Sequence, residues 1–286
     1  MSKVGVIGLG RMGTALAQKL VKQDISVKGW TRSGRKVKGV ECVSSLEEIV
    51  IKSDTLILSL LDDDAVADIL DHLLELDLNG KLIVETSTVV PAILTDRIAT
   101  ITRKGAMAVD APIAGGPELV LAGQCGFFIG GEDAAVSRAR EILEAITNRL
   151  FHVGPLGTGL VMKTINNSML QVYLSGLNDL MPLAHKAGLP LETALRILSG
   201  GPAGMPMIAD RIPKILGEDK DVGFALSAAF KDNDVFNRVL KSYGLSSVAL
   251  ASFGDLQAKA EKEGLIERDP AELISLSYHE KASDED

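Results

Sequence analysis

A lysine and an asparagine four residues apart are the residues of this chain best suited to chemistry. Lys163 and Asn167 both belong to the run from Gly157 to Asn167. On a helix, residues with this spacing face the same way, one turn apart. A primary amine and an amide placed in this way would serve as a proton donor and an orienting group beside a carbonyl.

A glycine-rich turn, Gly8-Leu9-Gly10-Arg11-Met12-Gly13, lies near the start of the chain. An apolar strand predicted over 4–7 precedes it and a helix predicted over 12–22 follows it, which is the context that a dinucleotide-binding turn requires. In such a turn Gly8 permits the tight bend, Gly10 lets the backbone approach a pyrophosphate, and Gly13 lets the helix pack close to the sheet. The helix N-terminus then offers N–H groups and a partial positive charge to the phosphates.

The residues that follow the second predicted strand, over 26–30, indicate which dinucleotide binds. An acidic residue at this place would hydrogen-bond a ribose 2′-hydroxyl and repel a 2′-phosphate. The chain has Thr31, Arg32 and Ser33 instead, followed by Arg35 and Lys36. A planar guanidinium suits a phosphate well. NADP(H) is therefore the predicted cofactor, in preference to NAD(H).

The hydrophobic pattern predicts two kinds of structure along the chain. Up to about residue 155, short apolar runs alternate with helical stretches, and the further predicted strands cover 55–61, 82–85, 106–110 and 150–153. Ser44 or Ser45 is expected to cap the helix that precedes the strand over 55–61. Their near-continuous hydrophobicity is typical of a parallel sheet covered on both faces. Beyond that point only helices are expected, over 160–187, 191–198, 224–243, 247–263 and 270–278.

The predicted fold class is therefore α/β: an N-terminal Rossmann-type doubly wound sheet over 1–155, followed by an all-α domain over 156–286 that is built on a long interdomain helix. The final residues, 283–286, are expected to form a solvated acidic tail. A single large domain is the alternative that the length of 286 residues leaves open.

Composition narrows the possible partners. Lys and Arg total 30 against 38 for Asp and Glu, so no general attraction for nucleic acid or anionic lipid is expected. No apolar stretch reaches the length of a membrane span and the first predicted strand begins at Lys3, so we expect neither a membrane span nor a signal peptide. Cys42 and Cys125 form no CxxC pair and the His residues lack metal-ligand spacing, so we expect no bound metal and a reducing, cytoplasmic location.

Four stretches of the chain together resemble the β-hydroxyacid dehydrogenase family, which includes 3-hydroxyisobutyrate dehydrogenases, tartronate semialdehyde reductases and glyoxylate/succinic semialdehyde reductases. The stretches are the glycine turn at 8–13, Asp110-Ala111-Pro112-Ile113-Ala114-Gly115-Gly116, the lysine run at 157–167, and Phe230-Lys231-Asp232. Glu85-Thr86-Ser87-Thr88, at the end of a predicted strand, adds to this combination. The resemblance extends over nearly the whole chain.

The resemblance implies a reaction in which hydride passes between the nicotinamide and a substrate carbonyl while Lys163 donates or accepts the proton. A free lysine has a pKa of about 10.4, so service as a base near neutrality requires a depressed value. Asn167 is expected to hold the substrate hydroxyl or carboxylate, and Gly115 and Gly116 to aim backbone N–H groups at an anion. Lys231 and Asp232 are expected near substrate or cofactor, and Leu60, Leu61 and Thr88 along the cofactor cleft.

One position departs from the family. Ala114 stands where relatives usually have a serine whose hydroxyl contacts the substrate, and the loss of such a hydrogen bond costs about 1.5–3 kcal/mol. Two other functions therefore stay open: an NADPH-dependent imine reductase, against which Lys163 counts, and a non-catalytic dinucleotide-binding protein.

The long predicted helix also suggests how the chain assembles. The helix carries more apolar residues than one small bundle is expected to bury, so we expect a homodimer or homotetramer packed through the helical domain. The residues concerned are Leu170, Tyr173, Leu174, Leu177, Leu180 and Met181.

Overall fold

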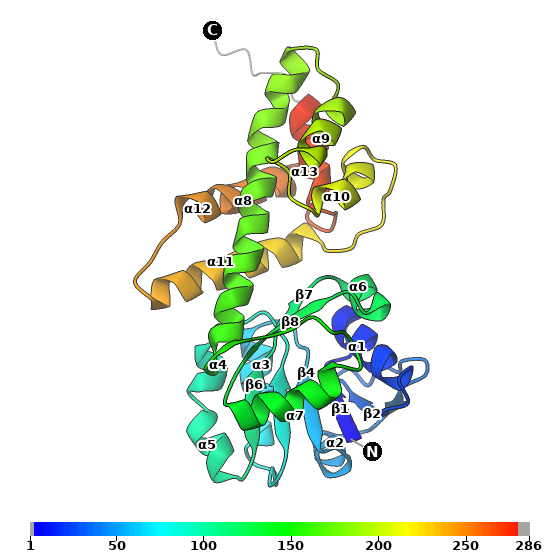
Figure 1. The fold of residues 1–286 in the computed structure, drawn as a ribbon, viewed down its shortest axis with the longest axis vertical. Coiled ribbons are helices and arrows are strands. Elements are labelled where there is room, and N and C mark those ends of the chain that lie inside the picture. Colours follow the sequence, from blue (N-terminus) through cyan, green and yellow to red (C-terminus); the bar gives the residue numbers. More distant parts are fainter. Residues whose placement is uncertain (1–2, 280–286) are drawn as a thin grey trace. The chain divides into compact units, whose positions relative to one another are not determined.

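The computed structural model describes residues 3–279, which form two compact units (Figure 1). The first unit is Met1–Asn166 and the second is Asn167–Asp286, so the boundary falls within a single long helix. The acidic tail expected over 283–286 lies outside the described residues.

A mixed sheet forms the centre of the first unit. Its strands run in the order β3-β2-β1-β4-β5-β6-β8-β7, with β9 paired to β8. The strands are β1 (Lys3–Ile7), β2 (Ser26–Trp30), β3 (Glu41–Cys42), β4 (Thr55–Leu58), β5 (Leu82–Glu85), β6 (Met107–Asp110), β7 (Ile113–Ala114), β8 (Gly126–Gly130) and β9 (Leu150–Gly154).

The prediction of a parallel sheet is correct for the strands from β3 to β6 in the sheet order, and it is wrong for the pairing of β6 with β8. β1, β2, β3, β4, β5 and β6 pair in parallel, for example Val4 with Val27 and Ile57 with Val84. β8 instead pairs antiparallel with both β6 and β7. The strand predicted over 55–61 ends at Leu58, because the chain leaves the sheet there and enters a helix at Asp63.

Helices cover both faces of this sheet. One core packs sheet residues such as Val4 and Ile57 against α1 (Arg11–Val21), α6 (Pro117–Ala122) and α7 (Asp133–Leu143). The other packs Leu56 and Ile83 against α2 (Leu46–Lys52), α3 (Asp63–Leu73), α4 (Ala92–Thr95) and α5 (Ile98–Arg103). Neighbouring residues of β4 therefore point into different cores, as the alternation of side chains along a strand requires. This confirms a doubly wound sheet.

The predicted cap of α2, the helix that precedes β4, is confirmed. The Ser45 side chain accepts a hydrogen bond from the Glu48 backbone N–H at 3.2 Å, and the Glu48 carboxylate accepts one from the Ser44 backbone N–H at 2.9 Å. The Ser45 contact satisfies an N–H group that the first turn of α2 leaves without a helical acceptor, and the Glu48 contact ties the residue before the cap to the helix.

The second unit is built of helices among its described residues. α8 (Thr158–Lys186) enters it, and α9 (Leu191–Gly200), α10 (Ile208–Ile215), α11 (Leu226–Ser242), α12 (Val248–Lys262) and α13 (Ala271–His279) follow (Figure 1). α10 was not anticipated from the sequence. The predicted limits of α8, 160–187, fall within two residues of those observed.

The apolar residues of α8 that suggested an oligomer are mostly accounted for within the chain. Leu174, Leu177 and Met181 are buried in the core of the second unit, and Leu170 and Tyr173 pack against it. Of the six residues, Leu180 alone remains largely exposed, at 62%. Leu180 belongs to an apolar stripe that stays exposed along α8, together with Ile165, Met169 and Leu183.

Candidate active site

The turn between β1 and α1 has the geometry that its glycines predict. Gly8 has a φ of +97°, and a Cβ there would lie 2.2 Å from the Ser59 carbonyl oxygen. A Cβ on Gly13 would lie 1.8 Å from the Gly8 carbonyl oxygen. The helix can therefore pack this close to the turn only because residue 13 is a glycine. A Cβ on Gly10 would meet nothing within 4 Å. The backbone at Gly10 therefore faces open space, where a ligand can approach it.

The N-terminus of α1 is left available for an anion. Gly10 is the N-cap and supplies no side-chain acceptor, and the first turn contains no acidic residue. Arg11 is exposed and Met12 half-buried, whereas the Leu9 side chain is buried in the core. Leu9 can therefore contact a cofactor only through its backbone. The N–H groups of this turn and the positive end of the helix dipole both favour a phosphate.

Residues that follow β2 lie beside this turn. The Gly8 N–H donates to the Trp30 carbonyl at 2.9 Å, so the segment after Trp30 leaves the sheet next to Gly8. Thr31 is half-buried, and Arg32 and Ser33 are exposed in a turn closed by the Gly34 N–H and the Thr31 carbonyl, 2.9 Å apart. The segment from Thr31 to Ser33 contains no acid.

The ends of β4 and β5 complete the same edge of the sheet. The Ser59 N–H donates to the Ile7 carbonyl at 2.9 Å, and the Leu60 N–H donates to the Ser87 hydroxyl at 2.9 Å. Leu61 is 73% exposed and Thr88 is half-buried. The predicted residues Leu60, Leu61 and Thr88 therefore lie at the carboxyl edge of the sheet that also carries the glycine turn, the place where such folds bind ligands.

Two buried carboxyl groups lie at this edge, and sequence reasoning gave neither a role. Glu85 ends β5, and its carboxyl accepts a hydrogen bond from the Ser87 N–H at 2.5 Å. Complete burial raises the pKa of Glu85 to about 7, because desolvation outweighs the contacts with Ser87. Its other oxygen, Oε2, has no hydrogen-bond partner among the described residues.

Asp110, at the end of β6, fixes the beginning of α8. Its carboxyl accepts hydrogen bonds from the Gly157 N–H at 2.6 Å and the Leu160 N–H at 2.8 Å. Burial nevertheless raises the pKa of Asp110 to about 6, against the opposing effect of these backbone donors. The first turn of the helix that carries Lys163 is thereby attached to the sheet.

Lys163 lies against the segment predicted to bind substrate. Its side chain is buried, at 7% exposure, and its Nζ donates to the Ile113 carbonyl at 2.6 Å. Ala114 completes β7 directly after Ile113, and Gly115 follows with a φ of +128°, a conformation that favours glycine. Gly116 is the N-cap of α6. The structure thus places Lys163 against Ile113, the residue directly before the segment Ala114-Gly115-Gly116.

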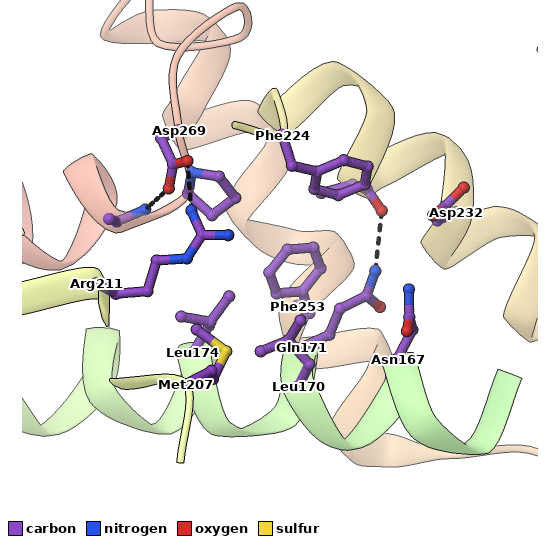
Figure 2. A pocket seen from close by; sticks show the side chains of 13 residues that line it. Asn167, Leu170, Gln171, Leu174, Met207, Arg211, Phe224, Asp232, Phe253 and Asp269 are labelled. Atoms are coloured by element: carbon purple, nitrogen blue, oxygen red, sulfur yellow. Dashed lines mark hydrogen bonds and ion pairs between the residues drawn. The ribbon is translucent and has the colours of Figure 1, made fainter. Parts of the chain in front are cut away.

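The other predicted site residues belong to the second unit. Asn167 lies one turn after Lys163 on α8, and both Asn167 and Asp232 line a pocket within that unit (Figure 2). The Lys231 ammonium is 2.7 Å from the Asp232 carboxylate. Residues 3–279 contain no group of three His, Cys, Asp or Glu side chains arranged to hold a metal ion.

A Rossmann-type sheet whose first turn is built in this way defines a dinucleotide-binding protein. The family model for the NAD-binding domain of 6-phosphogluconate dehydrogenase matches residues 3–154, and that for the NAD-binding region of NADP-dependent 3-hydroxyisobutyrate dehydrogenase matches residues 157–277. The chain belongs to the β-hydroxyacid dehydrogenase family, and it is an oxidoreductase.

The chain is similar to individual relatives and solved structures over nearly its whole length. An NAD-dependent L-serine dehydrogenase of Pseudomonas aeruginosa is 29% identical, over 94% of this chain and 95% of its own. The structure of the Mycobacterium tuberculosis 3-hydroxyisobutyrate dehydrogenase with L-serine has a TM-score of 0.87 at 23% identity, and the similarity covers 96% of this chain and 99% of that one. An imine reductase from Bacillus cereus has a TM-score of 0.63 at 23% identity, with 98% and 100% covered, so it shares the fold.

No helix within residues 3–279 combines the length and the apolar character that a membrane span needs.

Proposed function

We propose that the protein is an NADP(H)-dependent dehydrogenase or reductase of a small β-hydroxyacid or semialdehyde, with Lys163 as its general acid and base. The observation that carries the proposal is the position of the Lys163 ammonium, buried and 2.6 Å from the Ile113 carbonyl, directly before Ala114 and Gly115. A proton donor held in this way can act on a carbonyl oxygen that binds beside the glycine segment.

The chain's own residues fit a nicotinamide dinucleotide. Gly10 leaves room for a pyrophosphate, the first turn of α1 offers N–H donors, and Leu60, Leu61 and Thr88 line the same edge. The bound cofactor supplies the hydride of the reaction. Thr31, Arg32 and Ser33 support a 2′-phosphate in preference to a free 2′-hydroxyl, so NADP(H) is the proposed cofactor and NAD(H) the less favoured one.

Lys163 performs the proton transfer in this proposal. In reduction its ammonium gives a proton to the oxygen of the substrate carbonyl as the carbonyl carbon gains hydride, and in oxidation neutral Lys163 takes the hydroxyl proton. The Ile113 carbonyl holds the amine in place by accepting one of its hydrogens. Asn167 orients the substrate oxygen from the next turn of the helix.

The remaining proposed contacts bind the acid group of the substrate. Gly115 and Gly116 supply backbone N–H groups, while Ala114 supplies only a methyl group. Lys231 and Asp232 form an ion pair at 2.7 Å and are proposed to contact substrate or cofactor as that pair.

A panel of small aldehydes, ketoacids and cyclic imines, assayed with NADPH and NADH in parallel, tests this function. We expect aldehydes or ketoacids to be reduced with NADPH at a higher kcat/KM than with NADH. Turnover of cyclic imines without turnover of any aldehyde would make the protein an imine reductase, an alternative that Ala114 and the shared fold support. If the dinucleotide binds but no substrate in any class is turned over, the protein is a binding protein.

We further propose that the protein assembles as a homodimer or homotetramer in the cytoplasm. The exposed apolar stripe on α8, Ile165, Met169, Leu180 and Leu183, supports an interface between copies of the chain. Cys42 and Cys125 are both free thiols, and Cys125 is buried, which suits a reducing compartment.

A further inference from the structure

The turn that follows β5 holds the chain that leaves β4 at two points. The Thr86 N–H and hydroxyl both donate to the Leu58 carbonyl, at 2.9 and 2.6 Å. Two residues after Leu58, the Leu60 N–H donates to the Ser87 hydroxyl at 2.9 Å. Because β4 ends at Leu58, the backbone at Leu60 is held by a side chain of the β5 turn and not by strand pairing.

Ser87 is itself held by Glu85, the last residue of β5. The Glu85 Oε1 accepts a hydrogen bond from the Ser87 backbone N–H at 2.5 Å, and both side chains are buried. This contact closes the turn from Glu85 to Ser87 and sets where the Ser87 hydroxyl lies. Two hydrogen bonds in line, from Ser87 to Glu85 and from Leu60 to Ser87, therefore connect a buried carboxyl to the edge of the sheet.

The Leu60 side chain lies against Gly8, the first glycine of the turn between β1 and α1. A Cβ on Gly8 would lie 2.9 Å from the Leu60 Cδ2, so the two residues are in direct contact. The same Cβ would lie 2.2 Å from the carbonyl oxygen of Ser59, the residue before Leu60. A shift of the backbone at Leu60 would therefore move a wall of the glycine turn.

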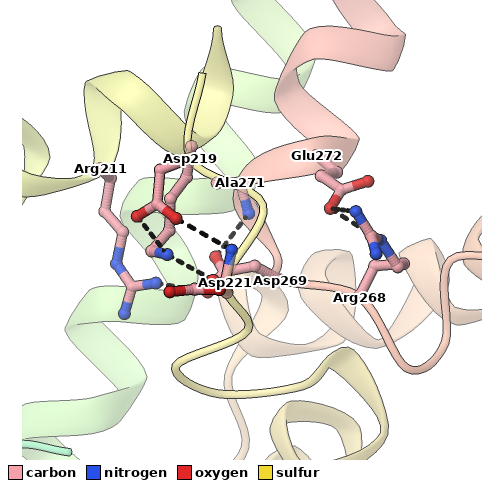
Figure 3. Close-up of polar contacts among 8 residues, drawn as sticks. Arg211, Asp219, Asp221, Arg268, Asp269, Ala271 and Glu272 are labelled. Atoms are coloured by element: carbon pink, nitrogen blue, oxygen red, sulfur yellow. Dashed lines mark hydrogen bonds and ion pairs between the residues drawn. The ribbon is translucent and has the colours of Figure 1, made fainter. Parts of the chain in front are cut away.

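Two other buried carboxyl groups have hydrogen-bond donors on both oxygens. In the second unit, the Asp269 Oδ2 accepts from the Arg211 Nη1 at 2.6 Å and its Oδ1 accepts from the Ala271 N–H at 3.1 Å (Figure 3). In the first unit, both oxygens of Asp110 accept from backbone N–H groups. Glu85 differs, because its Oε2 is the only buried carboxyl oxygen within residues 3–279 that has no hydrogen-bond partner.

The unpartnered oxygen of Glu85 lowers the stability of the fold. A buried polar group without a partner costs free energy. Burial, with smaller contributions from the acidic side chains of Asp110 and Asp63, also raises the pKa of Glu85 to about 7. Buried acids of this kind gather at functional sites. The place of Glu85, at the edge of the sheet that carries the glycine turn, agrees with a functional role.

We propose that Glu85 is a positioning residue for the dinucleotide, and that it acts through Ser87 to hold the Leu60 backbone against Gly8 in the arrangement that the bound cofactor requires. The inference goes beyond the proposed function, and it rests on that function only in placing the dinucleotide at this edge. The glycine turn receives the pyrophosphate, which NADPH and NADH share. Loss of the Glu85 contact therefore weakens both dinucleotides alike.

Fluorescence titration with NADPH and NADH tests the proposal through binding alone. Glu85→Ala should raise both dissociation constants about five- to tenfold, the effect of one hydrogen bond. Glu85→Gln should retain nearly the wild-type affinity, because its amide oxygen can still accept from the Ser87 N–H. Unchanged affinity in Glu85→Ala, a loss confined to NADPH, or an equal loss in Glu85→Gln would overturn the proposal.

A control variant separates positioning from a general loss of stability. Leu73→Ala removes a fully buried side chain at the last residue of α3. This substitution should lower the melting temperature, because it leaves a cavity in the core, and it should leave both dissociation constants unchanged. If Leu73→Ala weakens both dinucleotides as much as Glu85→Ala does, Glu85 has only a structural role and the proposal is wrong.

A double-mutant cycle tests the path through Ser87. Ser87→Ala removes the acceptor of the Leu60 N–H and should weaken both dinucleotides by about the same factor as Glu85→Ala. The combined variant should bind no more weakly than either single variant, because both substitutions break one line of contacts. Losses that multiply in the combined variant would show that Glu85 acts by another route and would contradict the proposal.

The failure of this inference is distinguishable from the failure of the proposed function. If the wild type binds both dinucleotides and reduces an aldehyde while Ser87→Ala binds them equally well, only the positioning role fails. Ser87→Ala gives this result even if Glu85→Ala does not fold. If the wild type binds neither NADPH nor NADH, the proposed function fails, and the inference fails with it.

Discussion

The Nζ of Lys163 donates a hydrogen bond to the backbone carbonyl of Ile113, a residue fifty positions earlier in the chain, at 2.6 Å. Two elements that are remote in sequence thereby meet at one amine. β7 presents the carbonyl through its antiparallel pairing with β8, and Asp110 holds the first turn of α8. The position of the amine therefore depends on the sheet as well as on the helix.

The first prediction concerns Asp110. Asp110→Ala removes the acceptor of the Gly157 and Leu160 N–H groups, both on buried residues. We expect the free energy of unfolding to fall by about 2–5 kcal/mol, since a buried donor left without a partner costs about 1–3 kcal/mol. We also expect kcat to fall because Lys163 is displaced. Urea denaturation and steady-state assays measure the two effects.

A matched control for Asp110 is Asp133→Ala, because the Asp133 side chain is 97% exposed at the start of α7. This control should change stability by less than about 0.5 kcal/mol. An Asp110→Ala protein as stable as the control would show that the carboxyl does not hold α8.

A second prediction follows from the buried carboxyl of Glu85, whose pKa is raised to about 7. Between the ordinary pKa of a glutamate and this value, the folded protein retains a proton that the unfolded chain has lost. Stability must therefore decrease as pH rises through this window. Relative to Glu85→Gln, which has no proton to lose, the wild type should lose about 3 kcal/mol between pH 5 and 8.

Chemical denaturation of both proteins at several pH values checks the Glu85 prediction. The exposed Glu141 on α7 provides the control, and the difference between Glu141→Gln and the wild type should not vary with pH. A wild type that instead gains stability relative to Glu85→Gln as pH rises would show that Glu85 is ionised in the folded protein at low pH.

A third prediction addresses the cofactor. Arg32→Ala should raise the KM for NADPH about ten- to a hundredfold and leave the KM for NADH nearly unchanged, because only NADPH carries the phosphate that the guanidinium is proposed to bind. Arg103→Ala, an exposed arginine of α5, is the control. A parallel loss with both cofactors, or a wild type that prefers NADH, would contradict the choice of NADP(H).

A fourth prediction concerns assembly. Met169→Glu combined with Leu180→Glu places two charges in the exposed apolar stripe of α8, where the side chains are 58% and 62% exposed. The wild type should be at least dimeric by light scattering at micromolar concentration, and the double variant should dissociate. Ile51→Glu, at a position 79% exposed on α2, should not change the mass. A monomeric wild type would contradict the proposed interface.

The sequence predicted those elements whose formation depends on residues close together in the chain. The apolar runs of β1, β2, β4, β5 and β6, the glycine turn and the cap at Ser45 each have a short-range physical cause, and each is present. β7 has only two residues, and its pairing of Ile113 with Phe127 depends on contacts across the fold. Patterns within a short window do not reveal such a strand or its antiparallel direction.

The candidate site likewise has features that the sequence predicted and features that it did not. The four-residue spacing of Lys163 and Asn167 is visible in the sequence, whereas nothing in the sequence identifies the Ile113 carbonyl as the acceptor of the Lys163 hydrogen bond. Arg211 and Asp269 are 58 residues apart and were not singled out from the sequence, because neither belongs to a recognisable motif. Asp110 was noticed as part of a motif, but its contacts with the start of α8 became clear only in three dimensions.

The most direct test of the account is the turnover of Lys163→Met with NADPH and the best aldehyde of the panel, beside Lys186→Met, which alters an exposed lysine at the end of the same helix. Loss of the proton donor should lower kcat about 10²- to 10⁴-fold. NADPH affinity, measured by fluorescence titration, and the melting temperature should confirm that the variant still folds and binds. A folded Lys163→Met protein that binds NADPH and retains kcat within about tenfold of the wild type would show that Lys163 is not the general acid.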